Sequence, residues 1–101
     1  METKTVIASL AALAQESRLG VFRLLVQAGP EGMAASRIAE AMAIPPSSLS
    51  FHLKELSHAG LIEAKREGRS IIYSANFAAM EGLVGFLTEN CCGGVPCGTR
   101  C

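Results

Sequence analysis

The sequence predicts a mainly α-helical domain with a small β-hairpin, and three observations support this fold class. Apolar residues recur at the three-and-four spacing of a helix along most of the chain. A Pro45-Pro46 pair separates two short central helices, and the apolar period changes to two after Gly60. With 101 residues, of which 50% are hydrophobic, the chain suits one small core. We expect one folded domain over residues 1–88 and a separate tail over residues 89–101.

The first and last helices are predicted at about residues 3–14 and 77–88, and both are rich in apolar side chains. Their large apolar residues are Val6, Ile7, Leu10 and Leu13 in the first helix and Phe77, Met80, Leu83, Val84, Phe86 and Leu87 in the last. A helix that is apolar around much of its surface is usually buried on several sides. We therefore expect both helices to contact a second copy of the chain in a homodimer. Packing within the monomer explains part of the same pattern.

The two central helices are predicted at residues 34–42 and about 47–59. Proline lacks an amide donor and pushes the residue before it out of helical dihedrals, so Pro45-Pro46 ends the first of these helices. Proline also suits the first turn of a new helix. The apolar stripe of the second helix consists of Leu49, Leu53 and Leu56. Two short helices joined in this way are typical of proteins that read duplex DNA.

The face of the second helix opposite the leucine stripe carries the side chains that we expect to contact DNA. Hydroxyl groups at a helix N-terminus bind phosphates or base edges, and an aromatic ring can touch a thymine methyl group. The expected DNA-contacting residues are Ser47, Ser48, Ser50, Phe51, His52 and Lys54. His52 lies closer to the leucine stripe than to the open side, so a structural hydrogen bond is the alternative to a base contact. A groove on a partner protein is the alternative target for the whole surface.

The hairpin is predicted from two alternating segments, residues 61–66 and 70–75, joined by residues 67–69. The cations near its tip are Lys65, Arg66 and Arg69. Positive charge at this place predicts a second contact with DNA phosphates. Glu63 and Glu67 offset two of these charges, so a solvated hairpin without a DNA contact is the alternative.

The charge balance limits how strongly the chain should bind DNA of any sequence. The formal net charge is zero, and residues 34–73 contain five Lys or Arg residues against four acidic residues. Because phosphate neutralisation supplies most non-specific affinity, we expect that affinity to be low. Specific binding should then depend on a symmetric dimer that places two recognition helices on two half-sites.

Three segments of the chain resemble the ArsR/SmtB family of metal-responsive repressors. They are residues 17–25, the step Ser50-Phe51-His52-Leu53 and the sequence Arg66-Glu67-Gly68-Arg69. The resemblance covers roughly residues 5–88, and the motifs are specific as a set rather than one by one. It implies a winged helix-turn-helix homodimer that represses an operon by binding its operator and leaves when a metal or metalloid binds.

Two positions depart from the family's pattern. The family often has a glycine between the two central helices, whereas this chain has Ala43, which would be strained in a left-handed conformation. The family often has Asp-Pro before the arginine of its second helix, whereas this chain has Glu16-Ser17, which we expect to cap that helix. Neither departure changes the function that the resemblance implies.

All four cysteines lie within residues 90–101, immediately after the last predicted helix. Soft thiolates bind soft centres such as zinc, copper(I) or thiophilic metalloids. The chain shows no charged-then-apolar leader and no apolar run of about 18 residues, so we expect a soluble, cytoplasmic protein. In a reducing cytoplasm these cysteines should not form structural disulfides.

The spacing of the four cysteines bears on which ion they would bind. Four thiolates would satisfy zinc in a tetrahedron, but adjacent ligands match poorly with the usual spacers of two to four residues. The resemblance implies instead an arsenic(III) or antimony(III) site, in which a vicinal cysteine pair after the last helix and one later cysteine form three bonds to the metalloid. The implied ligands are Cys91, Cys92 and Cys97, with Cys101 as the alternative third ligand. An incidental tail and a redox switch through reversible disulfides stay open.

Other sensor sites familiar in the family have no matching residues here. An arsenic site before the turn needs cysteines, and residues 33–36 contain none. A zinc site on the last helix needs histidines and carboxylates, and Glu81 is the only ionisable residue between positions 76 and 88. The tail is therefore the only sensor candidate.

An enzyme is not expected from this sequence. The chain has no phosphate-binding glycine loop, and its two histidines, His52 and His58, both lie in the expected recognition helix. Neither of them is placed there to activate a cysteine nucleophile. We therefore predict a DNA-binding repressor.

Overall fold

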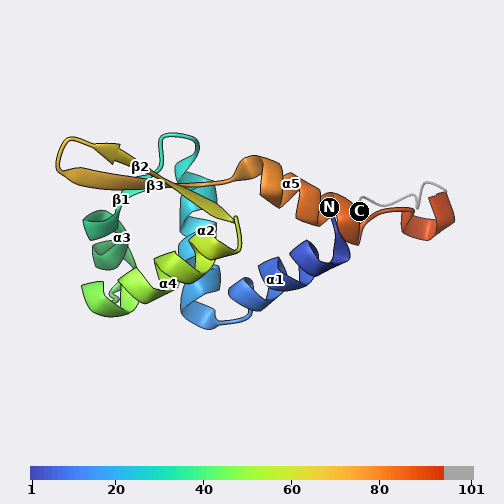
Figure 1. The fold of residues 1–101 in the computed structure, drawn as a ribbon, viewed down its shortest axis with the longest axis horizontal. Coiled ribbons are helices and arrows are strands. Elements are labelled where there is room, and N and C mark those ends of the chain that lie inside the picture. The colour runs from blue at the N-terminus through green and yellow to red at the C-terminus, as the bar shows by residue number, and fades with distance from the viewer. Residues whose placement is uncertain (95–101) are drawn as a thin grey trace.

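The computed structural model describes residues 1–94 and confirms the predicted fold class (Figure 1). Its helices are α1 (Thr3–Leu13), α2 (Glu16–Ala28), α3 (Ala35–Met42), α4 (Pro46–His58) and α5 (Phe77–Leu87). Its strands are β1 (Met33–Ala34), β2 (Ile62–Glu67) and β3 (Ser70–Ala75), and a short 3-10 turn, η1, covers Cys91–Gly94. α3, α4 and the hairpin gather at one end of the molecule, whereas α1 and α5 extend towards the other (Figure 1). None of the described helices has the length and apolar character needed to cross a bilayer.

α2 begins at a different cap from the one predicted. Gln15, and not Glu16-Ser17, is the N-cap residue, and its side-chain Oε1 accepts a hydrogen bond from the Arg18 amide at 2.9 Å. Glu16 is instead the first residue of the helix, where a carboxylate is favourable beside the positive end of the helix dipole. The helix ends at Ala28 because Gly29 turns the backbone to a φ of 80°.

The core is built around α2, α3 and α4. Its buried members are Val21, Phe22, Leu25, Ile38, Leu49, Leu53, Leu56, Leu61, Ile62 and Ala75. The three leucines of the predicted α4 stripe are at most 3% exposed, which confirms that stripe. Full burial of one leucine side chain contributes about 2 kcal/mol. The stripe therefore decides which face of α4 points outward.

The sheet has three antiparallel strands in the order β1-β3-β2, and the sequence predicted only two of them. The prediction that Ala34 belongs to a helix is wrong, because this residue is extended, with ψ of 148°, as the N-cap of α3. Met33 pairs with Tyr73, and Ala34 pairs with Ile72. Gly32 permits this pairing, because a Cβ atom there would collide with the Tyr73 carbonyl group. The β1 strand thereby ties the start of α3 to the hairpin.

The hairpin turn is tighter than predicted. Glu67 pairs with Ser70, so two residues, Gly68 and Arg69, form the turn in place of the expected three. Gly68 has a φ of 62°, a conformation that glycine adopts without the clash of a side chain. Arg69 therefore lies at the tip itself.

α1 and α5 contact each other and leave apolar side chains uncovered in the single chain. Ile7 and Leu10 on α1, Leu19 on α2, and Val84 and Leu87 on α5 are 41 to 60% exposed. Single exposed apolar residues are normal on a protein surface. Several of them on neighbouring helices are typical of an interaction surface.

Candidate nucleic-acid interface

The turn between α3 and α4 sets the position of the second helix. Ala43 ends α3 in a left-handed conformation (φ 54°, ψ 43°), which is the strained geometry considered for this residue. The Ala43 amide donates to the Glu40 carbonyl at 3.3 Å, and the Ile44 amide donates to the Ala39 carbonyl at 3.0 Å. These bonds satisfy carbonyl groups at the end of α3 and so hold the turn in place.

The N-terminus of α4 presents backbone donors that have no partner within residues 1–94. Pro45 and Pro46 have no amide hydrogen, and the first bonded amide of the helix is that of Leu49, which donates to the Pro45 carbonyl at 2.9 Å. The amides of Ser47 and Ser48 are therefore open, and no acidic residue lies in this first turn. Both serines are exposed. Their amides and hydroxyl groups form a donor cluster at the positive end of the helix dipole, which suits a phosphate group.

The outer face of α4 has the exposure expected of a recognition helix. Five of the six predicted contact residues are exposed, namely Ser47, Ser48, Ser50, Phe51 and Lys54. Phe51 is 57% exposed, a position in which its ring could meet a thymine methyl group. The structure thus brings these side chains onto one open face, and their contact with DNA stays a prediction.

His52 differs from its neighbours on α4 because it is half-buried. Its Nδ1 atom lies 3.5 Å from Nη1 of Arg18 on α2. Its ring also meets the Phe51 ring edge-on, with centroids 5.8 Å apart. The contact with Arg18 is of the structural kind that was expected as the alternative role of His52. A contact between His52 and a base stays a prediction.

Arg18 is the residue of this region that sequence reasoning missed. Its contact with His52 joins residues 34 positions apart, and no local pattern reports such a pair. Arg18 lies within residues 17–25, one of the segments that resemble the family. That resemblance is the only feature of the sequence that points to a role for Arg18.

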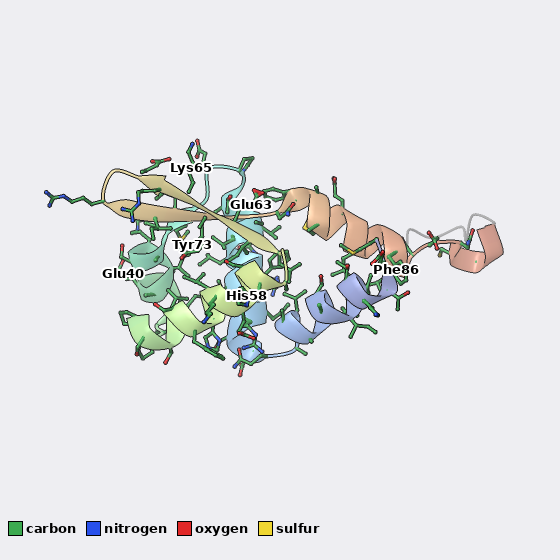
Figure 2. The ribbon with its side chains drawn as sticks, in the orientation of Figure 1. Glu40, His58, Glu63, Lys65, Tyr73 and Phe86 are labelled. Carbon is green, nitrogen blue, oxygen red and sulfur yellow. The ribbon has the colours of Figure 1, made fainter. Side chains whose placement is uncertain are left out.

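The hairpin carries its cations in exposed positions. Lys65, Arg66 and Arg69 are all exposed, and Figure 2 shows Lys65 pointing away from the helices. Side chains alternate along a strand, so Lys65 shares its face of β2 with Glu63 and Glu67. Arg66 lies on the other face, away from the two acidic residues. Arg66 and the tip residue Arg69 are therefore the cations best placed to meet a phosphate without competition.

A groove of about 450 Å³ lies between α2 and α5. Its lining residues are Leu13, Leu19, Phe22, Arg23, Val26, Gln27, Met80, Leu83 and Val84. Most of these are apolar, and Leu19 and Val84 are among the exposed apolar residues described above. The exposed apolar surface therefore extends over α2 as well as α1 and α5. The sequence did not indicate the part on α2.

Cys91, the first cysteine of the tail, lies four residues after Leu87, where α5 ends. Cys91 and Cys92 lie in η1, and their Sγ atoms are 3.8 Å apart. Cys92 is disulfide-bonded, which differs from the expectation of thiols in this segment. Cys97 and Cys101 lie outside the described residues, so the predicted third ligand does too. Among residues 1–94 no three Cys, His, Asp or Glu side chains are grouped to hold a metal ion.

Comparison with known proteins identifies relatives of the central part of the chain. The family model described as a helix-turn-helix domain matches residues 13–64. The nodulation protein NolR of Rhizobium meliloti is 31% identical over 80 residues, which is 79% of this chain and 63% of that protein. The chain thus spans less than two thirds of the length of this relative.

Two solved structures extend the similarity to more than four fifths of the chain. An ArsR-like transcriptional regulator from Rhodococcus sp. RHA1 superposes with a TM-score of 0.73 at 27% identity, covering 83% of this chain and 76% of that one. The second is a homodimeric winged helix-turn-helix DNA-binding domain from Mycobacterium bovis, described as a possible ArsR-family transcriptional regulator. It superposes with a TM-score of 0.68 at 30% identity, covering 86% of this chain and 81% of that one.

Proposed function

We propose that this chain, which belongs to the ArsR family of winged helix-turn-helix transcriptional regulators, is a cytoplasmic repressor that trivalent arsenic or antimony releases from its operator. The fold and the family are those of transcriptional regulators rather than enzymes. The repressor acts as a homodimer, and the metalloid binds the cysteine tail.

The open N-terminus and exposed face of α4 carry the DNA-binding part of this proposal. The unpartnered amides of Ser47 and Ser48 are placed for a backbone phosphate, and Phe51 and Lys54 follow on the same open face. The hairpin adds Arg66 and Arg69, which are suited to a second phosphate contact. An acidic residue in the first turn of α4 would repel a phosphate, and this turn has none.

The dimer is supported by the uncovered apolar side chains of α1 and α5. Val84 and Leu87 on α5 and Ile7 on α1 are each more than half exposed in the single chain. The relative from Mycobacterium bovis is a homodimer. Two recognition helices held about 34 Å apart by such a dimer would fit successive major grooves on one side of the duplex.

The effector site is proposed at Cys91 and Cys92, with Cys97 or Cys101 as the third ligand. Two sulfurs bonded to one tetrahedral ion at about 2.3 Å are about 3.8 Å apart. The Sγ atoms of Cys91 and Cys92 are 3.8 Å apart, a separation that would suit one soft ion after the disulfide bond of Cys92 is reduced. Three thiolates favour a three-coordinate metalloid over zinc, which prefers four ligands.

Release follows from the position of the tail directly after α5. In the reduced tail, three thiols would displace the three hydroxyl groups of arsenous acid as water and hold the metalloid through three sulfur bonds, which would order the tail next to one of the two dimer helices. The dimer then holds its recognition helices at a spacing that no longer fits both half-sites. To invert the bound fraction from 99:1 to 1:99, the metalloid must favour the released form by about 5.5 kcal/mol.

A thiol redox switch is the second candidate, and the disulfide bond of Cys92 favours it. In this mechanism a peroxide oxidises two thiols to a disulfide, and hydrogen peroxide takes up the two electrons and two protons to form two water molecules. In this mechanism the protein releases DNA when the tail is oxidised, and no metalloid is needed.

The test is fluorescence anisotropy with a labelled duplex selected in vitro on the reduced protein. Arsenite, antimonite, zinc and hydrogen peroxide are then titrated separately into the complex. Release by arsenite and antimonite at lower concentrations than zinc or peroxide supports the proposal. Release by peroxide alone supports the redox switch, and release by zinc alone supports a zinc sensor. If no duplex can be selected, the exposed face of α4 has a target other than DNA and the proposal is wrong.

A further inference from the structure

We propose that Arg18 positions His52 so that the imidazole presents a single N–H group, at Nε2, to a hydrogen-bond acceptor on the operator. Arg18 is then a positioning residue that does not itself touch DNA. This inference deepens the proposed function, because it rests on α4 being the recognition helix.

The Arg18 side chain links three helices. It projects from α2 and is half-buried. Its Nε atom donates to the Ala12 carbonyl near the end of α1 at 2.6 Å, and its Nη1 atom lies 3.5 Å from His52 Nδ1 on α4. α2 packs against both of these helices (Figure 1). The short bond to Ala12 anchors the guanidinium, so its position at His52 depends on the backbone and not on a freely rotating side chain.

The chemistry of the guanidinium decides the state of the imidazole. Arginine carries five N–H donors and no acceptor, and it stays charged in proteins. An atom that faces Nη1 must therefore offer a lone pair, so His52 Nδ1 carries no proton. Of the two neutral tautomers, the one that offers a lone pair to Nη1 carries its proton on Nε2.

Nε2 is the ring nitrogen farther from the backbone, and within residues 1–94 it has no hydrogen-bond partner. The His52 ring also meets the Phe51 ring edge-on. His52 lies four residues after Ser48, so the two side chains are neighbours on successive turns of α4. The Nε2–H group is thus a fixed donor one turn along the helix from the serine donors. Phosphate oxygens and the N7 and O6 atoms of guanine are acceptors of the kind it would meet.

Two substitutions separate the roles of the ring nitrogens. In His52→Asn the side-chain oxygen takes the place of Nδ1 and keeps the acceptor for Arg18, but the distal donor is lost. In His52→Gln the side-chain nitrogen takes the place of Nε2 and keeps the distal donor, but the acceptor for Arg18 is lost. We expect His52→Asn to bind operator about tenfold more weakly, with an unchanged Tm. We expect His52→Gln to bind more tightly than His52→Asn, with a lower Tm.

His58 provides a matched control on the same helix. It is exposed, and no residue of the described chain forms a hydrogen bond with it. His58→Asn and His58→Gln should therefore bind operator equally well. Equal affinity of the two His52 variants would overturn the proposal.

Arg18→Lys tests the positioning role without removing charge. A lysine has one compact ammonium group and does not reach both the Ala12 carbonyl and His52 with a rigid fork. We expect weaker operator binding by Arg18→Lys. Arg18→Gln removes the charge and should leave the dependence of affinity on salt unchanged, because Arg18 neutralises no phosphate. A smaller salt dependence in Arg18→Gln would show direct contact of Arg18 with DNA and overturn the positioning role. In the His52→Asn background, Arg18→Lys should cause no further loss.

Nitrogen NMR of the histidine rings at about pH 8, where an ordinary imidazole is neutral, measures the ring state without DNA. We expect protonated Nε2 and unprotonated Nδ1 for His52, and a mixture of both tautomers in Arg18→Lys. A protonated Nδ1 in the unmodified protein would overturn the proposal.

Phe51→Ala distinguishes a failure of this inference from a failure of the proposed function. If Phe51→Ala leaves operator affinity unchanged, α4 is not the recognition helix and the proposed function fails with the inference. If Phe51→Ala weakens binding and His52→Asn does not, α4 reads DNA and only the role given to His52 is wrong. Weakening by both substitutions supports the proposal. Comparison of operator with scrambled DNA then assigns the acceptor, because a phosphate contact weakens both duplexes and a base contact weakens operator binding alone.

Discussion

Cys91 and Cys92 place their Sγ atoms 3.8 Å apart just beyond the carboxyl end of α5, one of the two helices expected to form the dimer. In the proposed mechanism, a ligand bound at this pair would act next to the helix that sets the spacing of the two recognition helices. A change of a few ångströms at the dimer interface is enough to move one recognition helix out of its groove.

The double substitution Cys91→Ser and Cys92→Ser should preserve operator binding and abolish release by arsenite. Both residues lie outside α4 and the hairpin, and serine retains their size without the soft thiolate. Anisotropy of labelled operator measures both properties. Thr88→Ala is the control, because it alters the end of α5 without removing a thiol and should keep arsenite release. Normal release from the double variant would place the sensor elsewhere.

Arg69→Ala should weaken binding to operator and to scrambled DNA by similar factors. Arg69 lies at the exposed tip of the hairpin, where it is suited to a phosphate rather than a base. The slope of log affinity against log salt should fall by about 1. Lys4→Ala removes an exposed cation from α1 and should leave the slope unchanged. Equal slopes for Arg69→Ala and the unmodified protein would exclude the wing contact.

Ala43→Gly should stabilise the protein by about 1 kcal/mol, because glycine adopts the left-handed conformation of this residue (φ 54°) without strain. Urea unfolding at a constant protein concentration measures the free energy of unfolding. Ala41→Gly is the matched control, since Ala41 lies in the helical part of α3 and is also exposed. Glycine there should destabilise by about 1 kcal/mol. A loss of stability in both variants would show that Ala43 is not strained.

Val84→Glu should convert the dimer into a monomer and weaken operator binding, because it places a charge at a 54% exposed apolar position of α5. Sedimentation equilibrium measures the association. Ile71→Glu is the control for exposed apolar surface outside α1 and α5, since Ile71 is 39% exposed on β3. The Ile71→Glu variant should remain dimeric. A dimeric Val84→Glu variant would show that α5 is not in the interface.

Several parts of the fold could be predicted from residues that are close together in the sequence. The leucine stripe of α4 follows from helical periodicity, and its three members are buried as predicted. The break at Pro45-Pro46 follows from the missing amide hydrogen and the restricted dihedrals of proline, which act within one or two residues. The resemblance pointed to Ala43 as a residue that would be strained if it were left-handed, and the structure has Ala43 in that conformation.

Other parts depended on segments that are distant in sequence. The short strand β1 exists because Met33 and Ala34 meet β3, and an isolated pair of residues carries no strand period. The cap of α2 is a glutamine, a residue type whose side chain does not by itself indicate a cap.

The sequence alone determined the helical periods, the two-helix unit with its hairpin, and the gathering of the cysteines at one end, because each depends on neighbouring residues. Only the tertiary structure decided that Arg18 meets His52 and that β1 joins the sheet. Such contacts arise when surfaces far apart in the chain pack together, and the free energy of that packing belongs to the whole core rather than to any local stretch.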